Sequence, residues 1–136
     1  MIGFDTFDVG RSGLTLSKTW LDVIANNIAN VNTVHPAGQA PFRASYVVAQ
    51  EILGPGPGPT GQGVRPVALV EDPSTPAMVP APGDPLADAN GNVTRPVVDL
   101  AVELTNMIMS QRSFEANERT IETARDMYQA ALQIGK

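Results

Sequence analysis

The sequence has no cysteine, a single histidine and only seven aromatic residues among its 136 residues. Without cysteine, disulfide frameworks, thiolate zinc sites, iron–sulfur clusters and thiol catalysis are excluded. The single histidine, His35, excludes a histidine-rich metal site as well. The length predicts one domain, but 16 alanines and few aromatic side chains supply little volume for a dense globular core.

The net charge and the hydrophobic runs exclude further classes of protein. The formal net charge of −5 argues against a nucleic-acid partner, which would require clustered Lys and Arg. No apolar run approaches the roughly 18 residues that a membrane span needs. The first residues, Met1–Asp5, lack the basic and apolar regions of a Sec signal peptide. We therefore expect no nucleic acid, no membrane span and no Sec-type signal.

Proline and glycine divide the chain into three parts. Residues 54–96 hold ten of the twelve prolines and seven of the twelve glycines, whereas residues 97–134 hold neither. Residues 1–34 hold three glycines and no proline. Because proline blocks helix interiors and glycine weakens them by about 1 kcal/mol relative to alanine, long helices are expected only at the two ends.

The C-terminal part has a seven-residue apolar repeat that predicts a long helix packed against another helix. Asp99 is a candidate N-cap, and Gly135 is a candidate C-terminal stop. The residues expected to pack are Leu100, Leu104, Met107, Phe114, Ile121 and Tyr128.

The N-terminal part has a matching repeat, and its packing residues are Phe7, Leu14, Leu21, Ile24 and Ile28. Gly10 and Gly13 weaken the first turns, so Ser12 could instead cap a shorter helix that begins near Gly13. Asparagines crowd the far end, and we expect the helix to end by Asn32.

These patterns predict a mainly α fold. The N- and C-terminal helices would pair as a coiled-coil-like antiparallel hairpin, forming one helical layer from residues 1–33 and 97–136. Residues 34–96 would form a Pro/Gly-rich loop and a small β excursion. Leu16, Trp20 and Val23 lie off the apolar line, so further partners should cover them: other chains or the folded-back middle segment.

The middle segment predicts a linker and short strands. Gly54–Pro59 alternates glycine and proline and is expected to be extended. Val64–Val70 and Met78–Val79 are short β-capable runs. Asn90-Gly91 is a two-residue hairpin signal, which would pair residues 86–89 with residues 92–95.

The chain offers no constellation for catalysis or for cofactor binding. His35 lies beside Pro36 in a loop context, and the prolines of Gly54–Pro59 lack the N–H groups of a phosphate cradle. If Gly91 were the sixth position of a calcium loop, Leu86 and Val97 would occupy ligand positions, so that match fails. We therefore expect neither an enzyme nor a cofactor or metal site.

One stretch resembles a known family. It comprises Asn26, Asn27, Ile28, Ala29, Asn30, Asn32 and Thr33, with Val31 between them. This stretch is similar to the N-terminal motif of bacterial flagellar rod, hook and hook-associated proteins. Further segments, Gly63–Arg65, Glu71–Ser74, Pro82–Gly91 and Asn106–Asn117, are most similar to the short C-type proteins of the proximal rod.

The resemblance implies a structural subunit of the flagellar basal body that polymerises by helix packing into a torque-transmitting drive shaft in the periplasm. It implies other copies and related rod proteins as partners, contacts with inner-membrane ring and hook-basal-body components, and passage through the flagellar type III export apparatus. The alternative is a soluble coiled-coil adaptor or secretion chaperone that binds one partner helix. A rod subunit would use its helical repeats for packing.

Overall fold

The computed structural model describes residues 2–36, 38–54 and 61–134. It contains two helices with four strands between them: α1 (Ile2–Ala29), β1 (Ser45–Leu53), β2 (Gly61–Glu71), β3 (Ala77–Pro80), β4 (Asn92–Arg95) and α2 (Leu100–Ile134). The helices predicted at the two ends and the strands predicted near Val64–Val70 and Met78–Val79 are therefore confirmed. The expected stop at Gly135 and residues 55–59 of the expected linker lie outside the described residues.

Helix α1 runs without interruption through Gly10 and Gly13, so the shorter helix capped by Ser12 is wrong. Both glycines face α2. A Cβ on Gly10 would lie 2.7 Å from Cγ1 of Ile121, and a Cβ on Gly13 would lie 2.6 Å from Oδ1 of Asn117. The glycines cost helix propensity, but they allow the two backbones to approach each other closely.

Helix α2 begins as the sequence predicts. The Asp99 carboxylate accepts hydrogen bonds from the backbone N–H groups of Ala101 (2.9 Å) and Val102 (3.2 Å), which confirms Asp99 as the N-cap. From there, α2 continues for 35 residues with no proline or glycine to interrupt it. At 1.5 Å per residue the helix is about 50 Å long.

The buried line between α1 and α2 consists mainly of small and polar residues. Gly10, Ser17 and Ile24 are buried at seven-residue spacing on α1, and Glu103 and Ser110 are buried on α2. The hydroxyl of Ser110 donates to the carbonyl oxygen of Ser17 at 2.9 Å. The contacts follow opposite chain directions, because Asn27 meets Glu103 near one end and Gly10 approaches Ile121 near the other.

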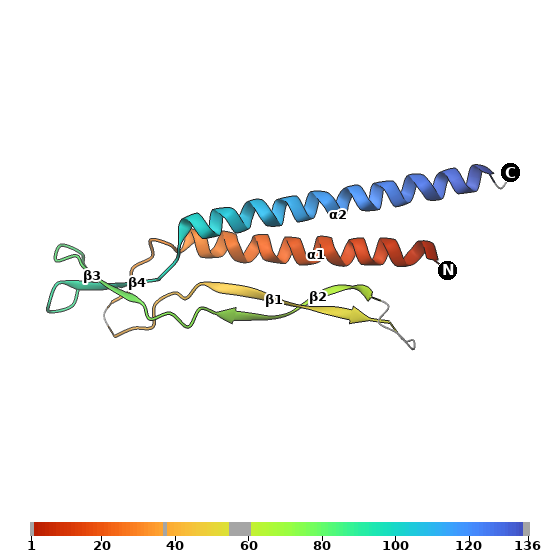
Figure 1. The fold of residues 1–136 in the computed structure, drawn as a ribbon. Coiled ribbons are helices and arrows are strands. Elements are labelled where there is room, and N and C mark those ends of the chain that lie inside the picture. Colours follow the sequence, from red (N-terminus) through yellow and green to blue (C-terminus); the bar gives the residue numbers. More distant parts are fainter. Residues whose placement is uncertain (1, 37, 55–60, 135–136) are drawn as a thin grey trace.

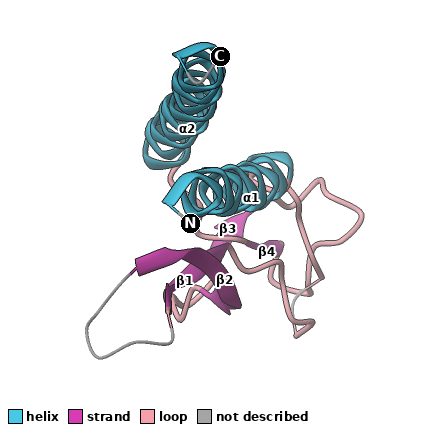
Figure 2. Ribbon diagram, turned by 90° about the vertical axis from the view of Figure 1, so that its right-hand side faces the viewer, coloured by secondary structure: helices cyan, strands magenta, loops and turns pink. Residues whose placement is uncertain are grey.

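The structure has three layers, with α1 in the middle (Figures 1 and 2). The β1–β2 hairpin packs on one side of α1 and α2 packs on another. Within the described residues, no Cα atom of α2 lies within 8 Å of a Cα atom of any strand. The middle segment therefore folds back over α1, which was one of the two covers expected from the sequence. It leaves the outer face of α2 uncovered.

Strand β1 was not predicted from the sequence. It pairs antiparallel with β2 from Ser45 opposite Glu71 to Leu53 opposite Gly61. The register shifts beside Ala49, which pairs with Pro66, and proline is tolerated in a strand at such an irregularity. The hairpin twists strongly along its length, and β1 and β2 cross in the view of Figure 1.

Strands β3 and β4 form a second antiparallel pair, from Ala77 opposite Arg95 to Pro80 opposite Asn92. The predicted pairing of residues 86–89 with residues 92–95 is therefore wrong. Asn90-Gly91 does lie in a tight turn, in which the Asp88 carboxylate accepts from the backbone N–H of Asn90 and of Asn92, each at 2.8 Å. Only Gly91 of the two has a positive φ (76°), whereas a two-residue type I′ turn needs both.

The β3–β4 pair is joined to the segment that follows α1. The backbone N–H of His35 donates to the carbonyl oxygen of Thr94 at 3.0 Å, and the N–H of Thr94 donates back at 3.1 Å. Val93 and Thr94 are buried beside this bridge. The pair extends the molecule beyond the end where α1 finishes and α2 begins (Figure 1).

Candidate assembly surface

The predicted packing residues differ in how far the single chain covers them. Ile24 is buried, and seven others are half-buried: Phe7, Leu14, Leu21, Ile28, Met107, Phe114 and Ile121. The remaining three are exposed, with Leu100 at 43%, Leu104 at 46% and Tyr128 at 49%. The apolar set is therefore incompletely covered within one chain, and its role in assembly stays a prediction.

The centre of the α1–α2 contact was missed by the sequence reasoning. Its residues also repeat every seven positions: Gly10 and Ser17 on α1, Ser110 and Asn117 on α2. Apolar periodicity does not reveal this line, because its residues are small or polar. Small or polar residues spaced by seven on both helices are the signal that could have found it.

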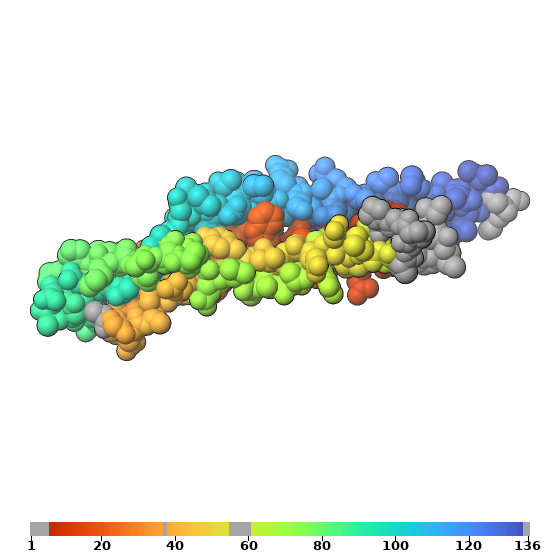
Figure 3. All heavy atoms as spheres, turned by 60° about the horizontal axis from the view of Figure 1, so that its bottom comes forward, coloured from red at the N-terminus to blue at the C-terminus, as the bar shows by residue number. Residues whose placement is uncertain are grey.

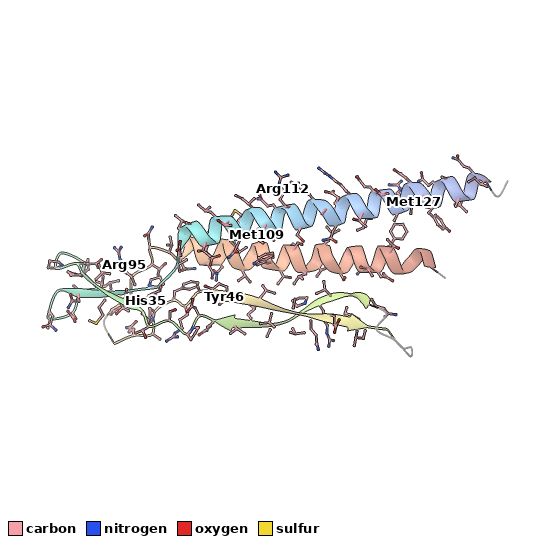
Figure 4. All side chains as sticks on the ribbon, viewed as in Figure 1. His35, Tyr46, Arg95, Met109, Arg112 and Met127 are labelled. Atoms are coloured by element: carbon pink, nitrogen blue, oxygen red, sulfur yellow. The ribbon has the colours of Figure 1, made fainter. Side chains whose placement is uncertain are left out.

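Helix α2 forms a ridge along one side of the molecule and the β1–β2 hairpin lies along the other (Figure 3). Between them is a groove of about 350 Å³, lined by residues that include Leu16, Trp20, Val64 and Asn117. Leu16 and Trp20 are half-buried there. On the outer side of α2, Arg112 points away from α1 (Figure 4).

Asn27, in the family-like motif, connects all three layers. Its amide nitrogen donates to the carbonyl oxygen of Ser45 on β1 (2.9 Å) and to Oε1 of Glu103 on α2 (3.1 Å). Its amide oxygen accepts from the backbone N–H of Ser45 at 3.0 Å. Asn27 is 1% exposed and Glu103 is 2% exposed. Among the described residues, the second carboxylate oxygen of Glu103 has no hydrogen-bond partner.

The other asparagines of the motif end α1. The amide nitrogen of Asn30 donates to the carbonyl oxygen of Asn26 at 2.9 Å, and the hydroxyl of Thr33 donates to Oδ1 of Asn30 at 3.1 Å. Ala29 and Asn32 are exposed, and Ile28 is half-buried. The motif therefore stops the helix and holds the chain where it turns towards the strands.

At the middle of α1, Ser12 holds β2. Its hydroxyl accepts from the backbone N–H of Val64 at 3.1 Å and donates to the carbonyl oxygen of Val9 at 2.7 Å. Gly63 has a φ of +114°, and a Cβ at that position would collide with the Ser12 side chain. Asn27 and Ser12 thus attach the two strands of the hairpin to α1 at points 15 residues apart.

Asp72 fixes the turn that leaves β2. Its carboxylate accepts from the backbone N–H of Ser74 (2.7 Å) and from the hydroxyl of Tyr46 (3.1 Å). Hydrogen bonds from the side chain and backbone of Ser74, followed by that from Tyr46, hold the pKa of Asp72 below its ordinary value of 3.8. Burial, followed by the hydrogen bond to Asp72, raises the pKa of Tyr46.

The polar residues considered for chemistry have local structural roles. Asp88 closes the turn before β4, and the Asp84 carboxylate accepts from the backbone N–H of Leu86 at 2.9 Å. His35 takes part in the bridge to Thr94 through its backbone. Across the part of the chain that the structure describes, no group of three or more His, Cys, Asp or Glu could hold a metal ion. In that same part, neither helix is apolar enough over sufficient length to cross a membrane.

Comparison with known proteins gives matches at both ends and over the whole length. Residues 7–35 match the family described as flagella basal body rod protein, and residues 89–134 match the C-terminal family of the flagellar basal body rod FlgEFG proteins. The flagellar basal-body rod protein FlgC of Yersinia enterocolitica is 38% identical over 96% of both chains. The FlgC proteins of Salmonella typhimurium (37%, 96% of both chains) and Bacillus subtilis (34%, all of both chains) are also similar.

Proposed function

Because this chain belongs to the flagellar basal-body rod proteins of the FlgC type, we propose that it is a structural subunit of the proximal rod, in the flagellar basal body. The observation that carries the proposal is the similarity over 96% or more of both chains to several such proteins. The rod would form by packing of α1 and α2 against neighbouring subunits and would transmit torque from motor to hook.

The packing unit in this proposal is a coiled-coil-like antiparallel hairpin of α1 and α2. Three observations support it: the reversed order of contacts, the seven-residue line of mainly small and polar residues between the helices, and the half-buried apolar residues beside that line. The helical layer would include residues 1–33 and 97–136, with residues 34–96 forming the β-containing excursion. Close-packed helices resist compression, which suits a shaft under torque.

Neighbouring subunits would cover what one chain leaves open. Leu100, Leu104 and Tyr128 are more than 40% exposed, and α2 has no strand packed on it within the described residues. A wide apolar surface of this kind is usually an interaction site. The partners would be other copies and related rod proteins, with inner-membrane ring and hook-basal-body components at the ends. The chain would reach the periplasm through the flagellar type III export apparatus.

A structural role needs neither catalysis nor a cofactor, and the proposal includes none. The relatives are rod proteins by name, and the carboxylates of Asp72, Asp84 and Asp88 are engaged in turns. A soluble adaptor or secretion chaperone is less well supported, because the similarity to rod proteins extends through the strands as well as the helices.

The experiment is complementation. A strain lacking the gene for this chain should assemble no rod beyond the point where the chain belongs, and the intact gene should restore motility. Purified basal bodies from the restored strain should contain the chain at the height of the proximal rod. Motile cells without the chain, or basal bodies that lack it, would refute the proposal, and a small soluble complex with one partner would favour the adaptor.

A further inference from the structure

Charge is distributed along α2 in three blocks. Residues 100–111 contain one charged residue, Glu103, which is buried against α1. Residues 112–126 contain seven charged residues, and residues 127–134 contain none. Both ends of the helix therefore present an uncharged surface, while the middle is charged.

Both uncharged ends are apolar and exposed. Near the start of α2, Leu100, Leu104 and Ile108 follow one another at spacings of four, which places them in a row on the helix surface, and Ile108 is 59% exposed. Near the end of α2, Leu132 is 57% exposed and Ile134 is 87% exposed.

Within the described residues, little of the chain lies against the last turns of α2. Thr6 of α1 lies at the same level as Ala124 and Met127, where the two helices line an open groove of about 290 Å³. Beyond this level α2 leans away from α1 and continues past its end (Figure 1). The C-terminal turns thus form an apolar projection at one end of the molecule, with the row of Leu100, Leu104 and Ile108 at the opposite end.

We propose that these two ends are the two halves of one joint, in which the C-terminal turns of α2 from one rod-family subunit lie on the row of Leu100, Leu104 and Ile108 of the next subunit along the rod. This inference rests on the proposed function and adds the partner surface. A contact between two different surfaces repeats from subunit to subunit and generates a filament, whereas a contact between two identical surfaces closes at a dimer.

The lack of charge at both ends of α2 favours the C-terminal turns of a neighbouring α2 as the segment that lies on the row. A partner helix with charged residues would lose their hydration on the apolar row without gaining an opposite charge, which is unfavourable. The uncharged C-terminal turns carry no such cost. The match of residues 89–134 to the C-terminal family of rod proteins covers the whole of α2, so related subunits carry the corresponding helix. The joint also leaves the charged middle block of α2 outside the contact.

The test is photo-crosslinking in assembled basal bodies. A benzophenone amino acid is placed at Ile108 in one variant and, as a matched control, at Glu118 in the charged block in another. After irradiation, basal bodies are purified and the crosslinked peptides are identified by mass spectrometry. We expect Ile108 to capture the last turns of the C-terminal helix of a rod-family subunit, and Glu118 to give at least tenfold less of that product. The reciprocal label at Leu132 should capture the first turns of such a helix.

Three results would overturn the joint: capture of a ring protein by Ile108, capture of the middle of another helix by Ile108, or equal yields of the product from Ile108 and Glu118. Absence of the unmodified chain from basal bodies would instead refute the proposed function.

A second measurement uses Ile108→Lys, which should lower incorporation into basal bodies at least tenfold, beside Glu118→Lys, which should incorporate like the parent chain. Normal incorporation of Ile108→Lys would also contradict the joint.

Discussion

Asn27 on α1 donates a side-chain hydrogen bond to Glu103 on α2 at 3.1 Å, across 76 residues of sequence and with both side chains almost completely buried. The same amide group makes two hydrogen bonds to the backbone of Ser45. One residue of the asparagine-rich motif therefore joins the helix pair to the β1–β2 hairpin. This contact explains why an asparagine stands at a position that a helical pattern alone would fill with an apolar residue.

Replacing Asn27 with alanine should strongly destabilise the fold. Among the described residues, Asn27→Ala would leave both carboxylate oxygens of Glu103 without a partner and would remove two hydrogen bonds to the Ser45 backbone. Since each unsatisfied buried group costs about 1–3 kcal/mol, we expect the free energy of unfolding to fall by about 3 kcal/mol or more. Denaturant titration measures it. The neighbouring Asn26→Ala, at an exposed position, is the control, and equal losses for the two variants would contradict the account.

Gly13→Ala tests the close approach of the two helices. A Cβ at this position would lie between 2.6 and 2.8 Å from the side-chain atoms of Asn117, so the asparagine must move and give up its hydrogen bond to the carbonyl oxygen of Ser113. We expect Gly13→Ala to destabilise the chain by about 1–2 kcal/mol. In an Asn117→Ala background the obstacle is gone, and the same change should stabilise by up to about 1 kcal/mol through helix propensity. Thermal unfolding of the parent, the two single variants and the double variant gives the effect of Gly13→Ala in each background. If Gly13→Ala also destabilised the Asn117→Ala protein, the close contact would be contradicted.

The helices could be predicted because their limits depend on local chemistry. Proline and glycine are absent from residues 97–134, and Asp99 supplies a cap that needs only its own next residues. The contact between the helices could not be predicted in the same way. Apolar periodicity located the half-buried flank, with Leu14 and Phe114, but the central line contains Gly10 and Ser110. Their burial depends on how closely two backbones approach, and that distance is set by the pair of helices together.

The strands show the same limit. The strand near Val64–Val70 was found from its composition, whereas β1 was overlooked although Tyr46, Val47 and Val48 are residues that favour strands. The Asn90-Gly91 turn was placed correctly, but its partner strand was not. Asp88 accepts from the backbone N–H groups of Asn90 and Asn92 in the turn, while β4 pairs with the more distant Ala77–Pro80. A dipeptide predicts a turn, but it does not show which strand lies beside the residues that follow it.

Gly63→Ala should loosen the β1–β2 hairpin from α1. Gly63 has a φ of +114°, which alanine rarely adopts, and its added methyl group would collide with Ser12. We expect a loss of about 1–3 kcal/mol in the free energy of unfolding. Hydrogen exchange at the Val64 amide should also accelerate, because its acceptor is the Ser12 hydroxyl. Gly61→Ala is the control, since no atom of the described residues beyond its chain neighbours lies within 4 Å of a Cβ at that position, and equal exchange rates in the two variants would count against this attachment.

Asp72 should make stability depend on acid pH. Its pKa is lower in the folded chain than its ordinary value of 3.8, mainly because of hydrogen bonds from Ser74. A depressed pKa of this kind stabilises the fold above the unfolded pKa, and that contribution is lost as the pH falls through the folded pKa. The free energy of unfolding should therefore decline less between about pH 4 and pH 2 in Asp72→Asn than in the parent. Denaturant titration over that range checks it, with Glu71→Gln as the control, and parallel slopes for Asp72→Asn and the parent would contradict it.

Phe114→Ala should weaken assembly of the rod more than it weakens folding of the isolated chain. Phe114 is half-buried in the single chain, so its truncation should cost about 1–2 kcal/mol there, and about 3–5 kcal/mol where neighbouring subunits bury it fully. Incorporation into basal bodies should therefore fall far more than the stability of the isolated chain. Quantitative mass spectrometry of basal bodies, beside denaturant titration, measures both effects. Glu118→Ala, at an exposed position in the charged block, is the control. Normal rods and motility with Phe114→Ala would show that this residue is not part of the packing surface.

Cryo-electron microscopy of purified basal bodies would show whether α1 and α2 of this chain are part of the wall of the proximal rod. We expect density for both helices at the level of the proximal rod, with Leu100, Leu104 and Tyr128 covered by neighbouring subunits. Basal bodies with a complete rod and no density for this chain would contradict the account. So would a rod in which these three residues face solvent.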